Sequence, residues 1–269
     1  MIKDITIGQY VPGESFVHKL DPRAKILIAV LYLIDLFVIK NFVGYAFVFL
    51  FVFITIYIAR LKFSYIYKGL KPIFILLLIT AILNLLMTRE GNEIYHMGFI
   101  KIYDEGVRLA VFMSVRLIFL IVGTSILTLT TSPIELTDGI ERLLGPFKRI
   151  GLPAHELAMM MTIALRFIPT LIDETDKIMK AQMARGADFD SGNIIQKAKG
   201  LIPLLVPLFI SSFRRADELA MAMEARCYRG GEGRTRMKIL KYTYNDLIAA
   251  LAFILLVIIS FITRKLPYF

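Results

Sequence analysis

The residues of this chain best suited to contact a partner are two arginines, each at the end of a helical pattern. Ala184-Arg185-Gly186 and Ala225-Arg226-Cys227 each close a segment whose apolar residues recur at helical spacing. A guanidinium is a planar fork of donors that suits a carboxylate. A cation at a helix C-terminus also interacts favourably with the negative end of the helix dipole and so stabilises its own helix. Helix capping is therefore the simpler interpretation of either arginine alone. Two near-identical endings on successive helices favour docking to a partner, because capping requires no particular flanking residues.

No catalytic or nucleotide-binding motif occurs in the sequence, which lacks G-x-x-x-x-G-K-[ST], H-E-x-x-H and G-x-S-x-G. The three histidines, His18, His96 and His155, lie in separate segments without the spacing of metal ligands. The single cysteine, Cys227, cannot form an internal disulfide. We therefore expect no catalytic residue, no metal site and no cofactor bound by this chain itself.

Composition places the helices in a membrane protein. Of the 269 residues, 57% are hydrophobic and 20% are charged, and the mean hydropathy is +0.66. Soluble domains average roughly 45–50% apolar residues, and a membrane-spanning helix needs about 20 mostly apolar residues. Five stretches approach that length: Ile26–Ile39, Phe42–Ala59, Pro72–Met87, Val107–Leu129 and Leu247–Ile262. We predict an all-α polytopic membrane protein with about five transmembrane helices and, in addition, long cytoplasmic amphipathic helices.

The distribution of Lys and Arg predicts the orientation, because short basic segments stay in the cytoplasm. Basic residues precede the first stretch and fill the connection between the second and third: Lys19, Arg23, Lys25, Arg60, Lys62, Lys68 and Lys71. The N-terminus should therefore be cytoplasmic and the C-terminus outside. Residues 1–131 would hold four spans, 132–244 the cytoplasmic helices and 245–269 the last span. The net charge of +10 is then explained by basic residues that flank the spans, set the topology and lie near anionic lipid headgroups. Nucleic acid is not an expected partner.

Few ionisable residues fall inside the predicted spans, and among them are Asp35, late in the first span, and Arg116, within the fourth. Both lie toward the outer half in the predicted topology. They could pair, which would lower the cost of placing either charge in the bilayer. A structural ion pair is the preferred interpretation and an ion pathway the alternative.

The predicted cytoplasmic region begins with a helix-start signal. Ser132-Pro133-Ile134-Glu135 combines a hydroxyl N-cap, proline at the first helical position and glutamate at the third, and the helix should run to Leu144. A longer helix should open at Pro153, bend at Pro169 and end at Arg185. A second should run from Ile202 to Arg226.

The two long helices are predicted to pack as a pair. Both are rich in Met, a side chain that adapts to more than one partner surface, although a Met-rich helix can equally be ordinary core. Ala216 and Ala220 lie one turn apart and should mark a close crossing of the helices.

Four sequence blocks resemble a known family, the T component of energy-coupling factor transporters. The first runs from His18 to Lys25 (HKLDPRAK), the second from Ala164 to Pro169 (ALRFIP), the third from Ala181 to Gly186 (AQMARG) and the fourth from Arg214 to Arg226 (RRADELAMAMEAR). They occur in the family order over most of the chain. One departure is Cys227, which stands where the family often has a glycine suited to a left-handed helix cap.

The resemblance implies an importer of four parts in the cell membrane of a prokaryote. Two cytosolic ABC ATPases would bind ATP and Mg²⁺, a small integral membrane protein would capture a vitamin or another micronutrient, and this chain would join them in the bilayer. Arg185 and Arg226, with their flanking residues, would dock the ATPases. Residues on both long helices would contact the capturing subunit: Met159, Met160, Met161, Ile163, Leu204, Leu205, Leu208 and Phe209.

Three alternatives stay open. The T component of a dedicated cobalt or nickel importer would share the fold and the arginine motifs. An ion-coupled secondary transporter is disfavoured by the lack of inverted repeats, broken midplane helices and several intramembrane charges. A membrane enzyme is disfavoured by the missing catalytic motifs.

Overall fold

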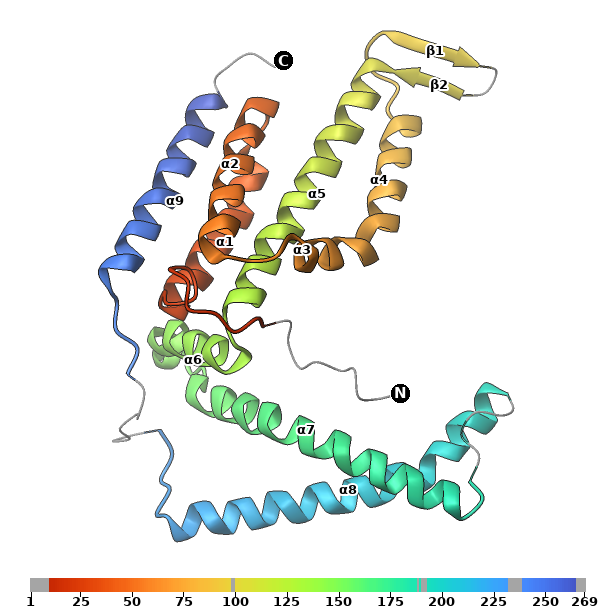
Figure 1. Cartoon of the computed structure of the whole chain (residues 1–269), viewed down its shortest axis with the longest axis vertical. Coiled ribbons are helices and arrows are strands. Elements are labelled where there is room, and N and C mark those ends of the chain that lie inside the picture. The colour runs from red at the N-terminus through yellow and green to blue at the C-terminus, as the bar shows by residue number, and fades with distance from the viewer. Residues whose placement is uncertain (1–9, 98–99, 188, 190–192, 232–238, 265–269) are drawn as a thin grey trace. The chain divides into compact units, whose positions relative to one another are not determined.

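The computed structural model describes residues 10–97, 100–187, 189, 193–231 and 239–264 (Figure 1). The chain divides after Gly139 and after Ile239, whereas the sequence analysis placed the boundaries after residues 131 and 244. Gly8–Gly139 and Leu240–Phe269 form one unit, called here the membrane unit. The other, the long-helix unit, begins at Ile140 and ends at Ile239.

The membrane unit consists mainly of helices that differ in length, from 14 to 27 residues. They are α1 (Pro22–Val38), α2 (Phe42–Ala59), α4 (Phe74–Met87), α5 (Asp104–Thr130) and α9 (Tyr244–Thr263), with the short α3 (Phe63–Leu70) and the single turn η1 (Lys71–Ile73) between α2 and α4. Local signals set several of these ends. Asp21 caps α1 by accepting from the Arg23 amide, and Thr243 and Asp246 form a capping box at α9.

Five described helices are long and apolar enough to cross a membrane: Phe42–Ala59, Phe63–Met87, Asp104–Thr130, Ala154–Ala184 and Tyr244–Thr263. Four of them cover predicted spans. The fifth, Ala154–Ala184, was predicted to be cytoplasmic, and α1, predicted as the first span, has only 17 residues. α1 nevertheless contacts α5 and α9, so it is an integral part of the same bundle.

The core of the membrane unit lies where α1, α2, α5 and α9 meet. Leu36 of α1, Val48 of α2 and Leu129 of α5 are almost completely buried there, at 0–1% exposure. α4 contacts α5 and buries none of its own residues. Its apolar side chains face outward, which a helix in contact with lipid tails tolerates at no cost.

Two elements of the membrane unit were not predicted. The connection between α4 and α5 contains the antiparallel hairpin of β1 (Glu93–Met97) and β2 (Ile100–Tyr103). The basic connection between the second and third predicted spans contains the amphipathic helix α3. Both elements are short.

The long-helix unit contains two helices of more than thirty residues. α6 (Pro133–Leu144) leads through the 3₁₀ turn η2 (Gly145–Ile150) to α7 (Ala154–Ala184), and α8 (Ile194–Ala225) follows. α8 starts at Ile194 rather than at Ile202, and it continues through two prolines. α7 and α8 are antiparallel, because late residues of one contact early residues of the other. Gln182 Nε2 donates to the Pro203 carbonyl at 3.4 Å, and the His155 ring lies beside Tyr228.

Candidate functional site

The C-terminus of α7 ends in a Schellman turn that carries the first arginine. Arg185 is the C-cap residue, and Gly186 follows in the left-handed conformation with φ of 87°. The Gly186 amide donates to the Met183 carbonyl and the Ala187 amide donates to the Gln182 carbonyl, both at 3.0 Å. These two bonds satisfy carbonyls that a helix end otherwise leaves unpaired.

The C-terminus of α8 repeats this turn. The Cys227 amide donates to the Glu224 carbonyl at 2.8 Å, and the Tyr228 amide donates to the Met223 carbonyl at 3.0 Å. Cys227 takes the left-handed position with φ of 57°, although glycine is the residue that adopts it without steric cost. The missing glycine therefore leaves the turn unchanged, and Arg226 holds the same C-cap position as Arg185.

Both guanidinium groups are available to a partner. Arg185 and Arg226 are exposed, and within the described part of the chain neither side chain makes an ion pair or a hydrogen bond. The helix ends are capped by backbone amides instead. The bonding capacity of each planar fork is thus free to meet carboxylates of another protein.

The surroundings of the two turns differ. After Arg226, the Tyr228 hydroxyl lies 3.2 Å from His155 Nε2 and 3.1 Å from Met159 Sδ. His155 Nδ1 in turn lies 3.0 Å from Glu141 Oε1. The equivalent of Tyr228 at the end of α7 is Ala187, which has no polar side chain. The second turn is therefore tied to α6 and α7, whereas the first makes no such tie within the described ranges.

Gly231 contributes to the same contact. A Cβ atom at this position would lie 2.6 Å from the His155 ring, which is closer than van der Waals contact permits. The chain after α8 thus passes against His155, and only a residue without a side chain fits there. Sequence reasoning missed this contact, because His155 and Gly231 belong to segments far apart in the chain.

The surface predicted for the capturing subunit is present only in part. Met160, Met161, Leu205 and Phe209 are exposed at 47–62%, and three further predicted residues, Met159, Ile163 and Leu208, are half-buried. Leu204 is only 5% exposed and does not belong to an accessible surface. One residue along a helix turns the side chain by about 100°, so neighbours such as Leu204 and Leu205 face different surroundings.

The predicted close crossing at two alanines is not observed. Ala216 and Ala220 are both exposed, and the hydrogen bonds of Ser211 and Arg215 to α7 lie on another face of α8. Glu174 of α7 accepts from Arg215 at 2.8 Å and from the Ser211 hydroxyl at 2.5 Å. A charged and a hydroxyl side chain therefore make the contact that small side chains were expected to make.

The predicted ion pair inside the membrane unit is also not formed. Asp35 is buried on α1, and its Oδ2 accepts from the Ser260 hydroxyl of α9 at 3.0 Å. Arg116 of α5 instead donates to the Tyr45 hydroxyl at 2.9 Å and to the Ile39 carbonyl at 3.3 Å. The two side chains therefore bond to different neighbouring helices, Asp35 to α9 and Arg116 to α2.

The first block of the resemblance, His18 to Lys25, joins three helix ends of the membrane unit. Lys25 is buried, and its Nζ donates to the carbonyls of His18 and Thr130, the last residue of α5, at 3.0 Å each. The Asp21 amide donates to Asp246 Oδ1 in the first turn of α9 at 2.7 Å. The block thus ties the start of α1 to the end of α5 and the start of α9.

Side chains of the same block strengthen this junction. Arg23 pairs with Asp21 at 2.8 Å, and its guanidinium lies 4.0 Å from the centre of the Tyr242 ring.

Burial lowers the pKa of His18, and the His18 ring lies 2.7 Å from the Ser15 hydroxyl and 3.0 Å from the Val11 carbonyl. Asp246 is the partner that sequence reasoning missed, although Thr243-x-x-Asp246 is a recognisable capping pattern.

No metal site is evident in the described ranges, where no three His, Cys, Asp or Glu side chains gather as ligands would.

Comparison with known proteins identifies the family of this chain. Residues 13–238 match the family described as cobalt transport protein. Curated relatives named energy-coupling factor transporter transmembrane protein EcfT include one from Clostridium kluyveri, 68% identical over 98% of both chains. Others are from Thermosediminibacter oceani, 60% identical over 98% of this chain and 99% of the relative, and Bacillus subtilis, 51% identical over 98% and 100%. This chain therefore belongs to the family of transmembrane T components of energy-coupling factor transporters.

Proposed function

We propose that the two arginine-bearing helix ends dock two cytosolic ABC ATPases, one at each end. The observation that carries this is the repetition of one exposed turn. Arg185 and Arg226 occupy the same C-cap position, and both are exposed. An acidic groove on each ATPase would accept the guanidinium fork, for which Lys would be a poorer substitute.

The remaining roles follow from this docking. ATP and Mg²⁺ are bound and ATP is hydrolysed by the ATPases, and this chain binds no cofactor of its own. The N-terminus faces the cytoplasm, as the basic residues around α1 and α3 favour. α7 and α8 transmit the closing motion of the ATPases to a small membrane protein that captures a vitamin or another micronutrient. Nucleic acid is not a partner.

The exposed members of the predicted surface are the proposed contact for that capturing protein. Met160 and Met161 on α7 and Leu205 and Phe209 on α8 leave large apolar side chains exposed, and Met adapts to partners of different shape. Leu204 is excluded from this surface because it is buried. The proposed contact is therefore smaller than the one suggested by the sequence.

Charge reversal tests the docking. Arg185→Glu and Arg226→Glu would each place a carboxylate against acidic groove residues, and truncating one partner of a buried charge pair costs roughly 2–5 kcal/mol. Each single variant should co-purify less ATPase, and the double variant should co-purify none. Arg149→Glu is a matched control, because Arg149 is an exposed arginine of η2 outside both turns. Wild-type recovery of both ATPases with the double variant would reduce the arginines to helix caps.

A dedicated cobalt or nickel importer is the second candidate, favoured by the description of the matching family as cobalt transport protein. The identity of the membrane protein that co-purifies with the intact complex, together with uptake of labelled cobalt against labelled vitamins, distinguishes the two. Cobalt uptake without vitamin uptake would assign the dedicated type.

A further inference from the structure

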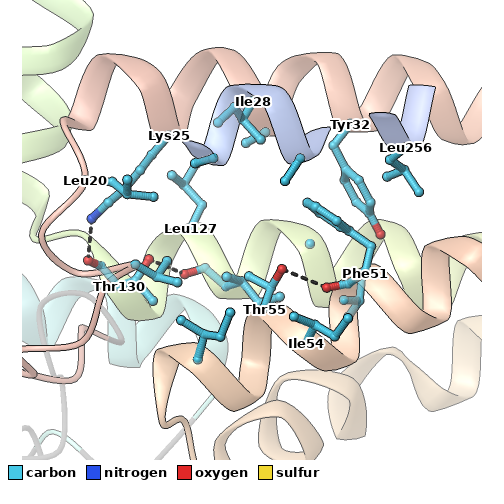
Figure 2. A pocket seen from close by; sticks show the side chains of 18 of the residues that line it. Leu20, Lys25, Ile28, Tyr32, Phe51, Ile54, Thr55, Leu127, Thr130 and Leu256 are labelled. Atoms are coloured by element: carbon cyan, nitrogen blue, oxygen red, sulfur yellow. Dashed lines mark hydrogen bonds between the residues drawn. The ribbon is translucent and has the colours of Figure 1, made fainter. Parts of the chain in front are cut away.

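The membrane unit contains an apolar cavity that the proposed docking function does not use. Its volume is about 410 Å³, and residues of α1, α2, α5 and α9 line it together with the segment before α1 (Figure 2). Twenty of its 24 lining residues are apolar side chains or glycine. Interiors of proteins pack densely, and voids much larger than a water molecule are few. A cavity of this size in a membrane protein therefore calls for an occupant.

The four polar side chains in the lining are already engaged. Lys25 Nζ donates to two carbonyls, those of His18 and Thr130, at 3.0 Å each. Tyr32 donates to the Phe119 carbonyl at 3.1 Å.

The two threonines behave in the same way. Thr55 donates to the Phe51 carbonyl at 2.8 Å, and Thr130 donates to the Ile126 carbonyl at 2.7 Å. Figure 2 shows the bonds of Lys25 and Thr55 running along the walls to the backbone. A polar solute would find no uncommitted donor among these side chains, so the lining favours a hydrocarbon over a hydrated substrate.

The cavity reaches the outer surface of the bundle. Leu50 and Ile54 of α2 and Leu255 of α9 line it and are 46–59% exposed. Val52 and Leu256, from the same two helices, line it and are buried. One side of the cavity is thus outer surface and the other is core. In a membrane the surface of such helices meets lipid tails.

We propose that this cavity holds one acyl chain of a bilayer phospholipid. The chain would enter from the exposed side and fill the space between α2 and the core, where the apolar lining replaces neighbouring lipid tails. Binding would come from close packing, because surrounding lipid is as apolar as the site. A bound chain should therefore exchange more slowly than lipid at the outer surface.

The absence of tryptophan from the chain makes a fluorescence test direct. Phe51→Trp places the only indole in the lining, whereas Phe53→Trp places it on the same helix at a residue that is 46% exposed and outside the lining. The full-length variants are reconstituted with phosphatidylcholine brominated on its acyl chains, which quenches indole fluorescence, and then mixed with excess unbrominated lipid. Fluorescence should recover on mixing for Phe53→Trp, and about tenfold or more slowly for Phe51→Trp, a factor that corresponds to about 1.4 kcal/mol of closer packing around the bound chain.

A filling variant tests the cavity itself. Ala252→Phe adds a ring to the lining from α9 and should abolish slow recovery in the Phe51→Trp background. Leu251→Phe is the control, because Leu251 is exposed and does not line the cavity.

Three results would overturn the proposal. Equal recovery of both indoles would mean an open groove with freely exchanging lipid. Quenching of Phe51→Trp by aqueous iodide but not by brominated lipid would mean a water-filled cavity. Loss of lipid quenching only in the assembled transporter would mean that a helix of another subunit fills it.

Discussion

The ends of α7 and α8 present one backbone turn in two surroundings. Both turns have a left-handed residue after the arginine and the same pair of backbone bonds. The turn at Arg226 is held by Tyr228 against His155, whereas the turn at Arg185 is followed by Ala187 and makes no equivalent contact to any residue that the structure describes. Local sequence thus shapes how each arginine is presented, while contacts with distant segments decide how firmly it is held. The second motif should be the more rigid of the two.

Removing the Tyr228 side chain should have the largest effect on this difference. Tyr228→Ala loses a half-buried ring and its contacts to His155 and Met159, a cost of about 2 kcal/mol. Amide hydrogen exchange at the end of α8 should then accelerate roughly 30-fold, to the level of the end of α7.

Two matched variants qualify this result. Tyr228→Phe keeps the ring and should cost only about 1 kcal/mol. Ala187→Gly, at the equivalent position after α7, should leave exchange at the end of α8 unchanged. If amide exchange at the end of α8 were as slow in Tyr228→Ala as in the wild-type chain, the contact of Tyr228 would not make this end more rigid than the end of α7.

Exchanging the left-handed residues should have a smaller effect, of opposite sign at the two ends. Gly186→Ala meets no atom within 4 Å, so its cost is backbone strain alone, about 1 kcal/mol. Cys227→Gly relieves the same strain. Exchange of the Ala187 amide should accelerate in the first variant, and exchange of the Tyr228 amide should slow in the second. If both variants changed the amide exchange rate in the same direction, the two turns would not be equivalent.

Breaking the contact between the middles of the helices should have the smallest effect, shared by both ends. Glu174→Gln weakens the bonds from Arg215 and Ser211, which should cost about 0.5 to 1 kcal/mol. The rate of amide hydrogen exchange should rise by a similar factor at the two helix ends that carry Arg185 and Arg226. Lys180→Ala is the control, because its pair with Asp176 is long, at 3.9 Å, and exposed. A rise confined to one end would show that this contact belongs to that end alone.

Elements with a complete local signal were predicted well. Ser132 was expected to cap α6, and its hydroxyl accepts from the Glu135 amide at 3.3 Å. The helix runs from Pro133 to Leu144 as predicted. The long amphipathic helices and their ends at Arg185 and Arg226 were also predicted, since the apolar period and the following polar sequence are both local.

Features that depend on rotation or on distant partners were not predicted. Pairing of Asp35 with Arg116 required two helices to face each other, and a change of one residue in register turns a side chain by about 100°. The β1–β2 hairpin was missed because alternation over five residues does not distinguish a strand from a loop. The extra turns of α8 before Ile202 were missed because residues 194–200 (IIQKAKG) contain only two large apolar side chains, which are adjacent and show no helical period.

Cys227 has a practical consequence for studying assembly. It is the chain's single cysteine, it is exposed, and it directly follows one of the two arginines proposed to dock the ATPases. A thiol-reactive dye therefore labels the natural protein at one motif without mutagenesis. Any partner that covers Arg226 should screen this thiol, so its labelling rate would report occupancy of the second motif while leaving the first untouched.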